Sequence, residues 1–231
     1  MGEVHFYGLA VDNKVLVALN AIGNQQATST ESTNEAINHI LEYLATYPND
    51  GIIYRYRSMV LAAHLNSGFH NEPKGRIQSG AHIFLDENEP APRWNGPILT
   101  IAQVIKLFMS PAPKAELGAL FITAKELVPK LQTLIEMGRP HTPTPIQIDN
   151  SMVAGVANDT IIEQKNKSMD LRLHWLRSRE SQQRLRFYCT PGSINWADYS
   201  TNHHPPIYHK SKRPLFEGAA QKLYQTLLSH C

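Results

Sequence analysis

The chain has 231 residues, of which 42% are hydrophobic, and a formal net charge of only +2. This length suits one ordinary domain with an extension, and so small a charge does not indicate nucleic-acid binding unless the basic residues cluster. The two cysteines, Cys189 and Cys231, exclude a disulfide framework, and the sequence shows neither a signal peptide nor an apolar run long enough to cross a membrane. We therefore expect a globular, cytoplasmic protein with no membrane partner.

The first fifty residues have a helical pattern. Apolar residues recur at helical spacing over residues 11–27 and again over residues 32–46. Ser32 and Glu35 have the S-x-x-E spacing of a capping box, and a Pro-Asn-Asp-Gly turn follows the second run. These features predict two helices within a helical extension over residues 1–50.

After Gly51 the pattern changes to short runs that are β-branched or alternate between apolar and polar residues. Three antiparallel strands are predicted at residues 52–57, 59–65 and 77–85. An exposed loop is expected at residues 86–96, where prolines and acidic residues gather, and a further strand at residues 98–108.

The second half of the sequence alternates helices with short strands. Its main helix is predicted at residues 115–137, and Pro129 should kink it. The elements predicted after it are a strand at 145–150, a helix at 151–158, an arginine-rich helix at 169–182 and a strand at 185–188. This order predicts a mixed α/β sheet with packed helices, over a domain of residues 51–212 and a helical tail of residues 213–231.

Three carboxylates lie at the ends of predicted apolar elements. Glu116 begins the main helix, Asp149 ends a strand, and Asp198 follows the last strand and its turn. Such side chains could converge on divalent ions, since Mg²⁺ prefers hard oxygen ligands. The alternative is structural: Glu116 would interact with the helix dipole, and Asp149 with Asn150 would cap the next helix.

Four segments, in order, resemble the ribonuclease H region of copia-type retrotransposon Pol polyproteins. They are PAPKAELGALF, TPIQIDNSMVAGVAN, KNKSMDLRLHWLRSRESQQRLRFY and PGSINWADYSTNHHPP. The resemblance covers residues 51–213, and residues 7–49 are more loosely similar to the end of the preceding reverse transcriptase. It implies a ribonuclease H-like fold, with a mixed five-stranded sheet, helices on both faces and a helical extension before it. Implied partners are an RNA/DNA hybrid and the rest of Pol, in the cytoplasm, a virus-like particle or the nucleus.

The resemblance also assigns a catalytic set. Such enzymes use four carboxylates and two Mg²⁺ or Mn²⁺ ions to cut the RNA strand of a hybrid, and three of the carboxylates correspond to Glu116, Asp149 and Asp198. The first aspartate of the family falls on Asn66, which offers one neutral oxygen where the family has two anionic ones. The resemblance therefore implies an enzyme with impaired activity. The alternative is an inactive nucleic-acid-binding or structural remnant.

A second departure lies near the last carboxylate. Where the family typically reads ADYFTKHH, this chain reads ADYSTNHH over residues 197–204. An aromatic residue and a lysine are thereby lost, and Asn202 stands at the position of the lysine. This departure also favours weak activity.

Basic residues concentrate between residues 165 and 186. The resemblance implies that this stretch binds the hybrid, whereas the residues alone equally allow a solvated helix face with Asp170 and Glu180 as ion-pair partners. The candidate nucleic-acid-binding residues are Lys165, Lys167, Arg172, Arg177 and Arg179.

The adjacent His203 and His204 are candidates for proton transfer at the metal centre. They are not expected to bind zinc, because two adjacent histidines followed by prolines lack the spacing of helical ligands. The tryptophans Trp94, Trp175 and Trp196 are expected to pack within the protein rather than stack on bases.

Overall fold

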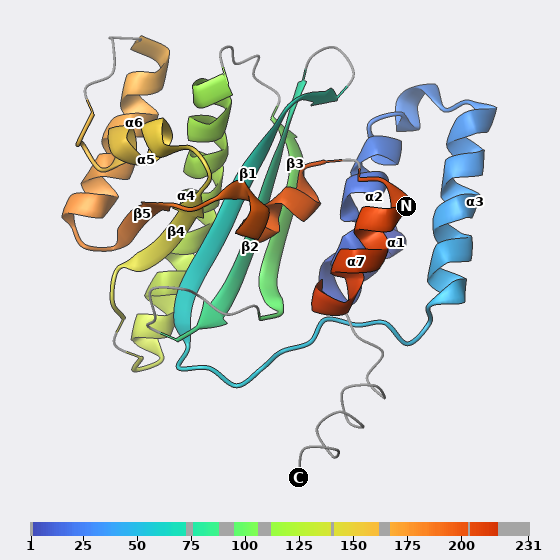
Figure 1. Ribbon diagram of the computed structural model, residues 1–231, viewed down its shortest axis with the longest axis horizontal. Coiled ribbons are helices and arrows are strands. Elements are labelled where there is room, and N and C mark those ends of the chain that lie inside the picture. The colour runs from blue at the N-terminus through green and yellow to red at the C-terminus, as the bar shows by residue number, and fades with distance from the viewer. Residues whose placement is uncertain are drawn as a thin grey trace. The chain divides into compact units, whose positions relative to one another are not determined.

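The computed structural model describes residues 2–72, 76–87, 95–105, 112–139, 141–161, 167–202 and 204–216 (Figure 1). The chain divides into two compact units. One consists of Tyr56–Asn202, and the other joins Met1–Arg55 to His203–Cys231. These limits differ from the divisions expected at residues 50 and 212, which stay predictions.

The larger unit is built on a five-stranded sheet with the strand order β3-β2-β1-β4-β5. The pairs β1–β2 and β2–β3 are antiparallel, whereas β1–β4 and β4–β5 are parallel. The mixed five-stranded α/β sheet expected of a ribonuclease H-like fold is therefore confirmed. Its strands are β1 (Val60–Glu72), β2 (Arg76–Asp86), β3 (Pro97–Ile105), β4 (Thr144–Ile148) and β5 (Leu185–Cys189).

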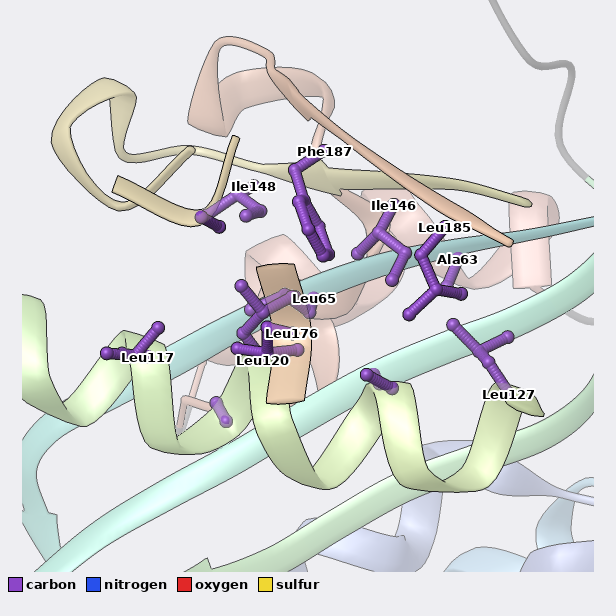
Figure 2. Packing of buried hydrophobic residues seen from close by; sticks show 14 of the residues in the cluster. Ala63, Leu65, Leu117, Leu120, Leu127, Ile146, Ile148, Leu176, Leu185 and Phe187 are labelled. Atoms are coloured by element: carbon purple, nitrogen blue, oxygen red, sulfur yellow. The ribbon is translucent and has the colours of Figure 1, made fainter. Parts of the chain in front are cut away.

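Helix α4 (Ala112–Glu136) packs on one face of the sheet, with α5 (Ser151–Ala157) and α6 (Lys167–Ser181) beside it (Figure 1). Because side chains alternate along a strand, every second residue of β1 points into this core. Figure 2 shows the apolar cluster that results. Its labelled members include Ala63, Leu65, Leu117, Leu120, Leu127, Ile146, Ile148, Leu176, Leu185 and Phe187, all of them buried.

The 3-10 helix η5 (Trp196–Ser200) lies against the opposite face of β1 and β2. His64, which alternates with the residues that face α4, stacks on Trp196 with ring centroids 4.4 Å apart and 6° between the ring planes. Gly80 on β2 allows a close approach here, because a β-carbon at this position would lie 2.4 Å from Cγ2 of Thr201. A residue larger than glycine at position 80 would therefore push the segment around η5 away from the sheet.

The smaller unit consists of helices. The described helices are α1 (Gly2–Ala10), η1 (Asn13–Val15), α2 (Leu16–Gly23), η2 (Gln26–Thr28), α3 (Glu31–Thr46) and α7 (Pro206–Phe216). Val15, Leu19, Ile22 and Ile40 form a small buried core. The unit also buries a charged group: Oδ2 of Asp50 accepts hydrogen bonds from Nζ of Lys14 at 3.0 Å and Nε of Arg213 at 2.7 Å.

Several sequence-based expectations about the elements were wrong. Residues 52–57 form no strand beyond a single bridge at Ile52, because the alternation of side chains finds no neighbouring strand edge to pair with. The helix expected over residues 11–27 is divided into η1, α2 and η2. The capping box of α3 consists of Thr30 and Thr33, not of Ser32 and Glu35.

Other expectations were close to the structure. Helix α4 covers the main helix predicted at residues 115–137 and continues through Pro129. Strand β3 covers most of the strand predicted at residues 98–108, whose last three residues lie outside the described part. Among the described helices, none has the length and apolar character required to cross a membrane.

Candidate functional site

Asn66 lies on β1, and Asp149 directly follows the neighbouring parallel strand β4. The two strands pair Ala63 with Ile146 and His64 with Gln147, so Asn66 and Asp149 each lie two residues beyond the last pair. Both residues therefore lie toward the same end of this strand pair.

Glu116 lies in the second turn of α4 and is partly buried. Its Oε1 accepts a hydrogen bond from Nδ2 of Asn150 at 3.2 Å, while its Oε2 is buried without a hydrogen-bond partner among the described residues. Burial raises the pKa of Glu116 to about 7; the bond from Asn150 opposes this rise and the charge of Asp149 adds to it. A half-buried carboxylate beyond the first turn is poorly explained by the helix dipole alone.

Asp149 interacts electrostatically with both other carboxylates. Burial raises its pKa, and the negative charge of Asp198 raises it further. Gly192 is close to it, since a β-carbon on Gly192 would lie 3.3 Å from Oδ2 of Asp149. The helix cap at this point is made by Asn150, whose Oδ1 accepts from the backbone N–H groups of Met152 and Val153. Asp149 is therefore not needed to cap α5.

Asp198 is held by two asparagine amides. Its Oδ1 accepts a hydrogen bond from Nδ2 of Asn66 at 3.1 Å and another from Nδ2 of Asn202 at 2.6 Å. The two departures from the family pattern thus meet at a single oxygen atom. We call Glu116, Asp149 and Asp198 the acidic site, and Asn66 with Asn202 the amide pair.

The acidic site fits a divalent ion only in part. Glu116 and Asp149 could hold one, because Oε2 of Glu116 is buried without a partner and each carboxylate disfavours the ionisation of its neighbour. At Asp198 the amide pair already donates to Oδ1, so a cation at this oxygen would compete with two hydrogen bonds. Among the described residues, no group of three or more Asp, Glu, His or Cys side chains is placed to share one metal ion.

The candidate nucleic-acid-binding arginines of α6 all make contacts within the larger unit. The guanidinium of Arg172 lies 5.5 Å from the ring centroid of Phe121, and that of Arg179 lies 5.1 Å from the ring of Trp175. Arg177 donates to the backbone oxygen of Val156 and pairs with Asp159 at 2.7 Å. Arg177 therefore has a structural role in tying α6 to α5 and to the turn that follows α5.

The remaining basic candidates are less defined. Lys165 lies outside the described residues, and Lys167 is the first residue of α6. Trp175 packs edge-on against Phe121, with ring centroids 5.4 Å apart, and Trp196 stacks on His64. These two tryptophans therefore pack within the protein, while Trp94 lies outside the described residues.

One of the two histidine candidates lies among the described residues. His203 lies outside the described residues. His204 belongs to the smaller unit, where its ring stacks on that of Tyr208 with centroids 4.0 Å apart. Their role in proton transfer stays a prediction.

Sequence reasoning did not predict that amide side chains support the acidic site. Asn150 and Asn202 donate to its carboxylates, and Asn195 holds η5 by donating to the backbone oxygen of Leu65 at 2.7 Å. The one available signal was position: Asn150 and Asn202 lie one and four residues after predicted ligands. Amide side chains are common in turns and caps, so this signal alone does not reveal a site.

Comparison of the sequence with protein-family models and with curated proteins gives no match. Comparison of the fold with solved structures gives matches at low identity. They include the N-terminal RNase H domain of a Mycobacterium tuberculosis protein, solved as a fusion with maltose binding protein (16% identity, TM-score 0.43, 62% of this chain and 91% of that chain). Another is LC11-RNase H1, isolated from compost by a metagenomic approach (15% identity, TM-score 0.46, 62% of this chain and 92% of that chain). A third is RNase H1 of the halophilic archaeon Halobacterium salinarum NRC-1 (15% identity, TM-score 0.40, 61% of this chain and 93% of that chain).

Proposed function

We propose that this chain is a ribonuclease H-like domain from a copia-type retrotransposon Pol polyprotein, with weak or no cleavage of RNA in RNA/DNA hybrids. The observation that carries the proposal is the position of Asn66: it lies two residues past the pair of His64 with Gln147, as Asp149 does, and its amide donates to Asp198. Asn66 therefore contacts one carboxylate of the expected set, which supports its assignment to the position of the fourth. The ordered sequence segments support the Pol context.

In this proposal the protein's own groups bind and orient the cleavable phosphodiester. Glu116 and Asp149 are the residues that would hold a divalent ion, Mg²⁺ or Mn²⁺. In an intact site, two such ions supply an activated water and stabilise the leaving oxygen. The site lacks the anionic ligand group of position 66, and Oδ1 of Asp198 is held by the amide pair.

The competing candidate is a remnant that binds nucleic acid without cutting it. The arginines of α6 bear on this choice, because Arg172 and Arg179 lie over aromatic rings and keep part of their donor capacity for phosphate. The paired Arg177 is structural in both cases.

Cleavage of a labelled RNA/DNA hybrid in Mg²⁺ or Mn²⁺ tests the proposal. The native chain is compared with Asn66→Asp and with Asn66→Asp combined with Asp149→Asn, which keeps the restored ligand and removes a neighbouring one. We expect little or no cleavage by the native chain, measurable cleavage by Asn66→Asp and none by the double variant. Strong cleavage by the native chain would contradict the impairment. Failure of every variant to cut or to bind the hybrid would contradict the nuclease assignment.

A further inference from the structure

We infer that Asn66 and Asn202 act together as a latch that occupies Oδ1 of Asp198, so that Asn202 is a positioning residue that governs whether this oxygen can bind a cation. The evidence is their convergence: two amide nitrogens, from β1 and from the turn after η5, donate to the same Oδ1 atom at 3.1 Å and 2.6 Å. A carboxylate oxygen has about two lone-pair directions. A cation could therefore use Oδ1 of Asp198 only by displacing an amide.

The hydrogen-bond network fixes the orientation of the Asn66 amide. Its Oδ1 accepts from the backbone N–H of Ser67 at 2.7 Å, so its Nδ2 must face Asp198. The reverse orientation would point two donors at each other beside Ser67 and two oxygens at each other beside Asp198. The position of Asn66 thus depends on its being an amide.

Asn202 is fixed in a similar way. Its Nδ2 lies 3.2 Å from Oγ1 of Thr201, and that hydroxyl donates to the backbone oxygen of Asp198 at 3.0 Å. The turn therefore holds the amide of Asn202 against the carboxylate even when the residue at position 66 changes. Hydrogen bonds to an ionised group are roughly twice as strong as neutral ones, so this donor resists displacement.

The latch predicts that the effect of Asn202 depends on the residue at position 66. With asparagine at 66, removal of Asn202 should change the affinity for a cation little, because position 66 supplies no carboxylate beside Asp198. With aspartate at 66, two carboxylates lie side by side and favour a cation, but Asn202 still competes for Oδ1. Loss of a charge-assisted hydrogen bond should then increase the affinity for Mn²⁺ by about ten-fold.

The experiment measures Mn²⁺ affinity by electron paramagnetic resonance of the free ion in four full-length proteins: native, Asn202→Ala, Asn66→Asp, and the double variant. Asn38→Asp, at an exposed position of α3, is the matched control for the added charge. We expect Asn202→Ala to change the affinity less than about two-fold in the native background and to raise it about ten-fold in the Asn66→Asp background. The latch would be overturned if Asn202→Ala changed the affinity equally in both backgrounds, or had no effect in the Asn66→Asp background.

A measurement on the native chain covers the case in which a variant fails to fold. Side-chain amide protons of Asn66 and Asn202 should exchange with solvent several-fold more slowly than those of the exposed Asn38, as measured by NMR. Exchange as fast as that of Asn38 would overturn the latch. The inference rests on the proposed function only in its choice of a divalent ion as the probe. If no variant bound the hybrid, the proposed function would be contradicted, but the comparison of Mn²⁺ affinities would still test the latch.

Discussion

A β-carbon on Gly80 would lie only 2.4 Å from Cγ2 of Thr201 and 3.0 Å from the backbone oxygen of Ala197. Gly80 pairs with Asn66 across β1 and β2, so this close approach lies directly beside the contact between Asn66 and Asp198. The lack of a side chain at position 80 therefore allows η5 to bring Asp198 to the sheet. Position 80 controls the geometry of the acidic site without contributing a ligand.

Gly80→Ala should destabilise the larger unit and loosen Asp198. Forcing a methyl group into this contact costs about 1–3 kcal/mol of the free energy of unfolding, as measured by urea denaturation. Gly51→Ala is the matched control, because a β-carbon there meets nothing within 4 Å. Combining Gly80→Ala with Thr201→Ser removes the closest contact and should recover part of the loss. A Gly80→Ala protein as stable as the control would show that η5 does not approach the sheet as described.

Glu116 should make stability fall between acidic and neutral pH. Its pKa in the folded protein is about 7, above the ordinary value of 4.5, because the carboxyl is buried. The folded state thus retains a proton that the unfolded chain releases, and the stabilisation present below pH 4.5 is lost as the pH rises toward 7. Glu116→Gln removes this dependence, so the variant should gain stability relative to the native chain between pH 4.5 and 7.

The measurement is the urea midpoint of both proteins at several pH values. Taking the difference between variant and native cancels the contributions of titrating groups that do not interact with Glu116. Glu136→Gln, at an exposed position of the same helix, is the control, and its plot of urea midpoint against pH should run parallel to that of the native chain. If the Glu116→Gln curve also runs parallel to it, the Glu116 carboxyl is solvated and the acidic site is more open than the structure indicates.

His82 should make the protein lose stability as the pH falls, whereas Glu116 makes it lose stability as the pH rises. Burial lowers its pKa from 6.5 to about 4, and the hydrogen bond to the backbone oxygen of Asn95 only partly opposes this shift. Below pH 6.5 the unfolded chain takes up a proton that the folded state excludes, so stability is lost as the pH falls from 6.5 toward 4. The loss is at most roughly 3 kcal/mol. His64 contributes in the same sense, since burial lowers its pKa to about 3.

His82→Gln should flatten this acid dependence in urea titrations, whatever its stability at neutral pH. The comparison protein is His174→Gln, which changes an exposed histidine on α6. An unchanged slope between pH 4 and 6.5 in His82→Gln would mean that the ring of His82 is protonated inside the folded protein.

The sequence predicted the sheet and its main helix because both depend on local periodicity. The three carboxylates were selected from an ordered pattern, and their role as ligands stays a prediction. The strand expected at residues 52–57 failed because a strand requires a partner edge, which local alternation does not specify. The role of Gly80 depends on a segment more than a hundred residues away in the chain. The convergence of Asn66 and Asn202 on one oxygen likewise results from the tertiary structure, although each was individually visible as a departure from the family pattern.

Asp50 provides the last prediction, in the smaller unit. Its carboxylate is buried and accepts from Lys14, whose side chain is 3% exposed, and from Arg213, whose side chain is 25% exposed. Asp50→Ala would remove one of the carboxylates that pair with the buried Lys14 ammonium and leave Asp12, at 3.5 Å. Breaking a buried ion pair from one side costs about 3–5 kcal/mol.

Arg213→Met should cost less, because Asp50 keeps Lys14 and the arginine is partly solvated in the native chain. Its loss includes the stacking of the guanidinium over Tyr47, 3.4 Å from the ring centroid. Urea denaturation of both variants shows which of them loses more stability. Glu35→Ala, at an exposed position of α3, is the control. Equal losses in the two variants would imply that Arg213, rather than Lys14, is the main partner of Asp50, and that α7 supplies most of the charge that makes its burial possible.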